Sequence, residues 1–221
     1  MAVTLNHANS PIFQNGTSGT LQCTVSAGTN IVAFAFVGLG PSGTSFASVT
    51  FNGIAMTPCG PLLGPGTGSA PYAQAFYLAS PPVGNNIPLV VTPNATSQMY
   101  LGLTSFNGVS QTTPVRPGSY ISTLGNATDV MSLTIPSNTS DMTVSLIDTG
   151  GNTIQNTNTN QTCDGTLETG SYGYGFDHCT TPASSVTHTW TLVAAVNRCV
   201  MLGFSIQGPS SGAAPVVFRL E

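Results

Sequence analysis

The side chains best suited to chemistry lie in one stretch of the sequence that begins at Cys163 and ends at Cys179. Cys163 and Asp164 open this stretch, and Asp177, His178 and Cys179 close it. Zinc binds these residue types, but structural zinc sites usually show paired cysteines about two to four residues apart, and no such pair occurs here. A disulfide between Cys163 and Cys179 is an alternative, worth on the order of 3 kcal/mol in an oxidising compartment. Ordinary loop residues are the third interpretation, and we predict no metal and no cofactor.

Nucleophilic and acid–base catalysis find little support in the sequence. Residues 208–212 read G-P-S-S-G and match the G-x-S-x-G pattern of a catalytic serine, which requires a strand that turns sharply into a helix. Ala213, Ala214 and Pro215 follow instead, so we interpret the segment as a linker. His188 alternates with Trp190 and predicts a hydrogen-bonded interior histidine. Glycoside hydrolysis needs two carboxylates at a working separation, and we find few donors: Asp129, Asp141, Asp148, Asp164, Glu168 and Asp177. We predict that the protein is not an enzyme.

Tyr172 and Tyr174 alternate with Phe176 along a glycine-containing stretch. Such tyrosine rings can face outward and stack on a sugar or on a neighbouring protein. The alternative is an ordinary strand whose aromatic side chains pack inside. Tyr172 and Tyr174 are therefore our candidates for a recognition surface.

Charge is scarce throughout the sequence. Only 5% of the residues are charged, no lysine occurs, and the formal net charge is -4. Without lysine there is no Schiff-base chemistry, no pyridoxal cofactor and no lysine cross-link. Arg116, Arg198 and Arg219 are too few to neutralise a run of phosphates, so we expect no nucleic-acid partner. The longest apolar stretches, residues 31–40 and 192–206, are too short or too interrupted to cross a bilayer, so we expect no membrane association.

Alternation of apolar residues with period two recurs along the chain and predicts about a dozen strands and no helix. Asn52-Gly53 predicts a two-residue hairpin turn that places Phe51 opposite Ile54. Residues 58–71 and 149–162 are polar and predict surface loops. Strands at this spacing without intervening helices indicate an all-β fold, an antiparallel two-sheet β-sandwich of jelly-roll type with long polar loops. We find no repeat of the kind that indicates a solenoid or a propeller.

The domain prediction is a single β-sandwich domain over residues 1–207, followed by residues 208–221. The second segment combines a flexible linker with an apolar strand arm in which Val216, Phe218 and Leu220 alternate. An apolar strand detached from the domain needs a partner, and strand addition to another subunit is a common solution. We predict assembly contacts through this arm, and a similar arm at Ala2–Asn6.

Four segments resemble a loose group of jelly-roll-like β-sandwich domains that occur in bacteriophage virion proteins and bacterial surface proteins. They are SVTFNGIAMT at residues 48–57, FYLASPPVGNNIPLVVT at 76–92, SFNGVSQTTPV at 105–115 and AAVNRCVMLGFSIQG at 194–208. The resemblance covers about three quarters of the chain. Its motifs are turns and core positions, so it implies a fold and a setting rather than a chemistry.

Together these features favour a non-enzymatic structural virion protein, a bacteriophage capsid decoration or cement protein. We expect it to be a homo-oligomer, with a trimer as one arrangement, that binds copies of itself and the major capsid protein. It would be assembled in the host cytoplasm and reside in the virion. The alternative is a carbohydrate-binding or host-recognition module of a phage tail or an extracellular bacterial surface, with a surface glycan as partner.

Overall fold

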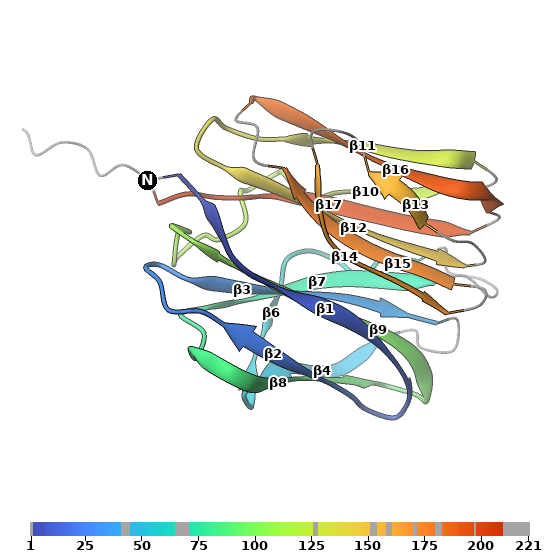
Figure 1. Ribbon diagram of the computed structural model, residues 1–221, viewed down its shortest axis with the longest axis horizontal. Helices are drawn as coiled ribbons and strands as arrows, with labels where there is room; N and C mark the ends of the chain where they lie inside the picture. Colours follow the sequence, from blue (N-terminus) through green and yellow to red (C-terminus); the bar gives the residue numbers. More distant parts are fainter. Residues whose placement is uncertain are drawn as a thin grey trace, which may run out of the picture.

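A computed structural model describes residues 2–40, 45–64, 71–125, 128–150, 154–157, 161–169, 172–179, 183–196 and 198–209. Its described residues form seventeen β-strands in four antiparallel sheets and contain no helix. The first half of the chain forms two sheets, A and B, and the second half forms two more, C and D. The sheets are stacked as layers, with sheet D at the top of Figure 1, then C, then A, and sheet B at the bottom. The all-β sandwich prediction is confirmed, and the described chain contains twice the predicted two sheets.

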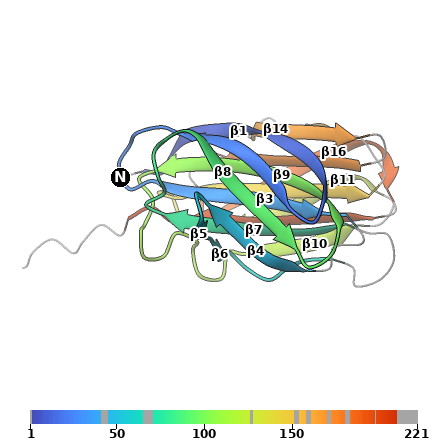
Figure 2. The same cartoon turned by 90° about the horizontal axis from the view of Figure 1, so that it is seen from below.

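The first half of the chain supplies sheets A and B. Sheet A contains, in spatial order, β1 (Thr4–Gly16), β9 (Ser97–Asn107), β3 (Val32–Leu39), β7 (Tyr72–Ala79) and β6 (Thr57–Pro58). Sheet B contains β2 (Gly19–Val25), β8 (Gly84–Pro93), β4 (Phe46–Phe51) and β5 (Ile54–Ala55). Figure 2 views the stack from the side of sheet B, where β8 runs obliquely across the strands of sheet A.

The second half supplies sheets C and D. Sheet C contains β10 (Ile121–Gly125), β17 (Cys199–Ile206), β12 (Met142–Gly150), β15 (Tyr172–Cys179) and β14 (Thr162–Thr169). Sheet D contains β11 (Thr128–Pro136), β16 (Ser185–Val196) and β13 (Ile154–Thr157). Within the described part of the chain, no helix has the length and apolar character that a membrane span requires.

The two halves have the same topology. When β5 is left out and the strands of each half are numbered from its own start, sheets A and C have the same strand order, and so do sheets B and D. The central strands β3 and β12 are equivalent, and each pairs with the last strand of its half: Val32 lies opposite Phe106, and Met142 lies opposite Ile206. The chain is therefore an internal duplication of one sandwich topology. The one-domain prediction for residues 1–207 stays a prediction, since the two sandwiches share a core.

Alternation along the central strands creates three apolar cores between the four layers of the described structure. In β3, Val32, Phe34 and Phe36 point toward sheet C, while Ala33 and Ala35 point toward sheet B. All eight residues of β3 are buried because both faces of its sheet are covered. The central core joins the two halves and is rich in aromatic rings, including Phe36 stacked on Phe176 at a centroid distance of 5.2 Å.

Side-chain amides of β1 close the edge of the neighbouring sheet. Asn9 accepts a hydrogen bond from the Thr24 backbone N–H (2.7 Å) and donates to the Thr24 carbonyl (3.1 Å). Asn6 bonds both backbone groups of Ser26 in the same way, and Gln14 does so for Thr20. These amides replace a backbone ladder along β2, an edge strand of sheet B, and so protect it from pairing with another chain.

Two predictions about local structure are corrected. The N-terminal segment is no free arm, because Thr4 and Leu5 pair with Asn107 and Phe106 of the same chain. The predicted polar loop at 149–162 contains strand β13, whose Ile154 is buried against sheet C and sheet D. Period-two alternation indicates a strand at the N-terminus but not the strand with which it pairs, and β13 has Ile154 as its single apolar residue, too few for an alternation signal. Val216, Phe218 and Leu220 lie outside the described residues.

Candidate functional site

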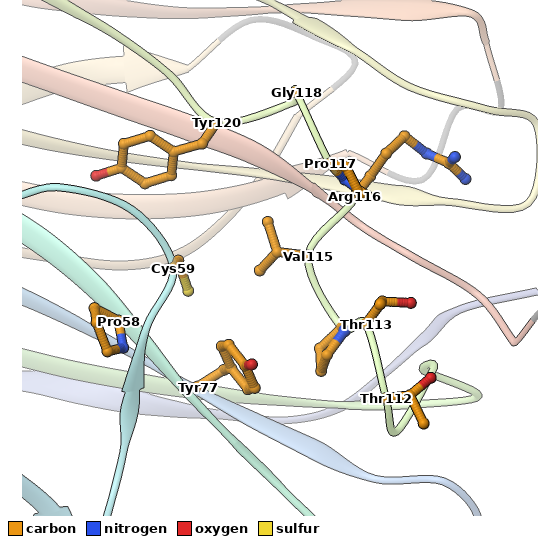
Figure 3. Close-up of a pocket in the computed structure, with 11 residues that line it drawn as sticks. Pro58, Cys59, Tyr77, Thr112, Thr113, Val115, Arg116, Pro117, Gly118 and Tyr120 are labelled. Carbon is orange, nitrogen blue, oxygen red and sulfur yellow. The ribbon is translucent and has the colours of Figure 1, made fainter.

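A pocket of about 290 Å³ lies at the junction of the two halves (Figure 3). It opens between β6 at the edge of sheet A and the segment that leads into β10 at the edge of sheet C. Its walls carry rings, prolines and hydroxyls and are formed by Pro58, Cys59, Tyr77, Thr112, Thr113, Pro114, Val115, Arg116, Pro117, Gly118 and Tyr120.

Backbone pairing holds the wall that residues 112–120 form. Val115 bridges to Ile206 of β17, and the Gln207 N–H donates to the Pro114 carbonyl at 2.8 Å. The Arg116 guanidinium binds the Asp141 carboxylate through two nitrogens, with Nη2 2.8 Å from Oδ1. A bidentate pair of this kind fixes both position and orientation. The wall is therefore a rigid part of the second half, with its cation held by an internal carboxylate.

Tyr120 and Cys59 bring uncharged polar atoms to the pocket. The Tyr120 ring stacks on Phe204 at a centroid distance of 6.2 Å, and its hydroxyl donates to the Pro61 carbonyl at 3.0 Å. Burial raises the pKa of the Tyr120 phenol and the pKa of the Cys59 thiol well above their ordinary values. Both groups therefore stay protonated at neutral pH, and the pocket presents rings and a neutral thiol.

The duplication shows that the fold does not require this pocket. Tyr77 pairs with Phe34 and Thr57, and its equivalent, His178, pairs with Val144 and Thr162. Beside His178, at the place equivalent to the pocket, the described residues of the two halves leave no opening. There β14 lies against β1, and the Asp164 and His178 side chains are 2% and 4% exposed.

The closure involves a buried hydrogen bond between two side chains. His178 Nδ1 lies 2.7 Å from Asp164 Oδ1, and the His178 ring meets Phe106 edge-on. Burial raises the pKa of Asp164, and its hydrogen bond with His178 opposes that rise. The same topology thus closes one junction with polar side chains and leaves the other open. That difference identifies the open junction as the candidate functional site.

A second constellation, between sheets C and D, looks catalytic but is sealed. Thr143 Oγ1 lies 2.8 Å from His188 Nε2, and His188 Nδ1 lies 2.9 Å from Asp177 Oδ1, in the order of a nucleophile, a base and an acid. Thr143, His188 and Asp177 are 1%, 0% and 0% exposed, so no substrate can reach the hydroxyl. The prediction of a hydrogen-bonded interior His188 is confirmed.

Further hydrogen bonds complete this buried network. Ser145 Oγ donates to Asp177 Oδ1 at 2.6 Å, Trp190 Nε1 donates to Ser145 Oγ at 2.9 Å, and Gln161 Nε2 donates to Asp177 Oδ2. In the first half, the positions of Thr143, Ser145 and Asp177 are occupied by Ala33, Ala35 and Phe76, which belong to an apolar core. The second half therefore has a buried polar network at positions where the first half, with the same topology, has apolar side chains.

The structure separates the two tyrosines predicted as a recognition surface. Tyr174 is 0% exposed, and its hydroxyl donates to the Phe36 carbonyl at 2.6 Å. The surface prediction is wrong for Tyr174, because it lies on the face of β15 that the first half covers. Tyr172 is half-buried and packs near Tyr100, at a ring distance of 6.4 Å.

The cysteine predictions are also settled by strand register. Cys163 is exposed and lies opposite Asp177, whereas Cys179 is buried and lies opposite Thr143. Both thiols are free, so the possible Cys163–Cys179 disulfide is not formed. Among the described residues, no group of three or more His, Cys, Asp or Glu side chains is placed to hold a metal ion.

Sequence reasoning missed the pocket residues Cys59, Tyr77 and Tyr120. Cys59 and Tyr77 lie close together at the edge of sheet A, and Tyr120 joins them only where the second sandwich packs against the first. A signal for the duplication exists: SFNGVS at residues 105–110 begins within the last residues of β9, and SIQGPS at 205–210 begins at the end of the equivalent strand β17. Comparison with known proteins gives no match: no family model fits the chain, and no curated protein or solved structure matches it.

Proposed function

We propose that this chain is a non-enzymatic structural protein of a bacteriophage virion, a capsid decoration protein that binds copies of itself and the major capsid protein. The virion setting rests on the resemblance of its turn and core motifs to virion β-sandwich domains. The mode of action, surface burial rather than catalysis, rests on how the structure uses its ionisable side chains.

The supporting observation is that all but one of the carboxylates whose exposure is described have side chains buried inside the molecule. Asp141 binds Arg116, Asp164 binds His178, Asp177 binds His188, and Asp148 is fully buried. Of the carboxylate side chains whose exposure is described, Glu168 alone is exposed. Hydrolysis of a glycosidic bond requires two carboxylates that face one substrate. What the described surface offers instead is Ser, Thr and Asn on sheet faces, together with strand edges.

Strand edges provide the assembly contacts in this proposal. Strand β10 pairs with β17 on one side, and in the described part of the chain no strand pairs with its other side. Leu124 on β10 is 52% exposed. An added strand would gain main-chain hydrogen bonds with β10 and cover this apolar side chain. The C-terminal segment 215–221, with Val216, Phe218 and Leu220, has the alternating pattern that such an added strand needs.

A capsid-binding assay tests the proposal. Purified shells of the major capsid protein are incubated with the full chain or with a chain that ends at Gly208, and occupancy and shell stability are measured. The full chain should bind and stabilise the shell, and the shortened chain should lose most of both effects. Equal occupancy by the two chains would contradict the role of the C-terminal segment, and no binding by either would contradict the decoration function.

One observation favours glycan recognition as a second candidate function. The open pocket combines Tyr77 and Tyr120 with the hydroxyls of Thr112 and Thr113, the ring-and-hydroxyl pairing that suits a sugar. On a glycan array, this function predicts a signal that Tyr77→Ala abolishes. Tyr172→Ala serves as the comparison, because Tyr172 lies outside the pocket lining.

A further inference from the structure

We infer that the junction pocket is the receptor for the C-terminal segment of a second copy of the chain, with Phe218 as the side chain that enters it. The inference rests on the proposed function, for which it names the receiving surface. Four observations carry it. They are the chemistry of the pocket, the apolar pattern of the segment, the point where the described chain ends, and the fact that β1 already occupies the equivalent position within the same chain.

The pocket suits one uncharged aromatic side chain. Its volume of about 290 Å³ is just below the roughly 300–1,000 Å³ typical of small-molecule sites. Pro58, Tyr77, Val115 and Tyr120 give it apolar walls, and Figure 3 shows these side chains around a common space with Cys59 among them. The Arg116 guanidinium is bound to Asp141. An aromatic anchor that fills a pocket and excludes water from it is a common energetic centre of a protein interface.

The segment outside the described structure carries one aromatic residue in an alternating pattern. Val216, Phe218 and Leu220 alternate after Pro215, so an extended conformation places all three on one face with Phe218 in the middle. Residues 210–221 would span roughly 40 Å when extended, which is enough to cross between neighbouring molecules. The central position of Phe218 makes it the anchor, with β10 available for pairing beside the pocket.

The described chain ends beside the pocket. The Ser110 N–H donates to the Gln207 carbonyl at 2.8 Å, and Gln207 N–H donates to Pro114 of the pocket wall, also at 2.8 Å. The segment therefore starts at the rim of its own pocket. Two copies placed with their pockets facing can exchange segments over a short distance.

The duplication explains why the segment goes to a second copy. After β9, the chain crosses to the other half, and Val115 pairs with Ile206 at the end of β17. The equivalent crossing after β17 would end beside Phe106 on β9. Leu5 of the same chain already pairs with Phe106 there. The segment after β9 has a pairing position beside Ile206 in the same chain. The C-terminal segment has no such position, because Leu5 already occupies the one beside Phe106.

A disulfide-trapping experiment on the full chain tests the inference, because Cys59 lies in the pocket wall. The background is Cys163→Ser, which removes the exposed thiol, while Cys23, Cys179 and Cys199 are buried. In this background Phe218→Cys is oxidised with copper phenanthroline and analysed on non-reducing gels. We expect covalent dimers that disappear when Cys59→Ser is added. Arg219→Cys is the matched control, since alternation directs residue 219 to the opposite face, and it should give several-fold less dimer.

Three outcomes would overturn the inference. They are no product that depends on Cys59, equal yields from the variants at positions 218 and 219, or a monomer with an internal Cys59 disulfide, which would place the segment in its own pocket. Loss of capsid binding by the chain that ends at Gly208, together with no Cys59-dependent product, would leave the proposed function standing and reject this pocket as the receptor. In the full chain without added cysteines, Phe218→Ala should weaken self-association about tenfold or more.

Discussion

Asp148 is the residue whose surroundings fit its chemistry least well. It is 0% exposed, and neither of its carboxylate oxygens has a hydrogen-bond partner. Burial raises the pKa of this carboxyl well above 3.8. Its neighbours do not offset this: burial and then the Asp148 charge raise the pKa of Tyr174, and burial raises the pKa of Tyr100 to about 12. Burial therefore favours the neutral form of this carboxyl over the charged form.

This predicts a pH dependence of stability that Asp148→Asn removes. In the unfolded chain an aspartate loses its proton near pH 3.9, whereas the folded chain holds the Asp148 proton to higher pH. Stability from this group is thus complete below about pH 3.9 and falls by about 1.4 kcal/mol per pH unit until pH reaches the raised pKa. The measurement is the free energy of unfolding in urea at about pH 5 and about pH 8. The value for the variant minus the value for the wild type should be larger at the higher pH. Parallel pH dependences would contradict the account, and exposed Glu168→Gln is the control.

The buried network around Asp177 gives a second prediction at the residue scale. Asp177→Ala leaves His188, Ser145 and Gln161 without their shared acceptor in a dry interior. Leaving a buried hydrogen-bonding group without its partner costs about 1–3 kcal/mol. Ser132→Ala removes an exposed hydroxyl pair with Thr189 and should change stability by less than about 0.5 kcal/mol. Denaturant midpoints measure both, and a cost below about 1 kcal/mol for Asp177→Ala would show that the network adds little.

At the scale of elements, the equivalent strands β3 and β12 meet face to face with complementary residues. Gly38 and Asp148 occupy equivalent positions, and a Cβ at Gly38 would lie 2.1 Å from Asp148 Oδ2. Gly102 is similarly matched to Phe176, whose ring would lie 2.3 Å from an added Cβ. In both pairs the first half supplies the glycine and the second half supplies the side chain that fills the gap, so the interface favours unlike halves over like ones.

A double-mutant cycle checks this complementarity. Gly38→Ala forces a methyl group against Asp148 and should destabilise the protein by about 1–3 kcal/mol. In an Asp148→Ala background the same change should cost much less, because the obstructing oxygen is gone. The coupling energy from chemical unfolding is the measurement. Additive effects of the two changes would contradict the contact.

How far sequence reasoning reaches can be seen in particular elements. The alternation in residues 32–36 predicts both faces of β3 correctly, and Asn52-Gly53 forms the predicted turn with φ values of 51° and 78°. Phe51 lies opposite Ile54 as predicted, yet Ile54 is 47% exposed because β5 extends past the core at a sheet edge. Local patterns fix faces and turns. They do not fix which sheet lies against which, and the pocket depends on that packing.

At the scale of the whole molecule, the two sandwiches share their central core. Phe34 and Phe36 from the first half pack with Phe176 and Phe204 from the second, so neither half can bury its inner sheet alone. We expect one cooperative unfolding transition. Trp190, the single tryptophan, reports on the core between sheets C and D, and far-UV circular dichroism reports on all strands. Their thermal or urea transitions should coincide, and two separate midpoints would show independent halves.

Sedimentation velocity of the full chain and of the chain that ends at Gly208, over a range of concentrations, tests the central claim of assembly most directly. The account predicts that the full chain forms oligomers whose fraction grows with concentration, and that the shortened chain stays a monomer. A full chain that remains monomeric throughout, or a shortened chain that associates equally well, would contradict it.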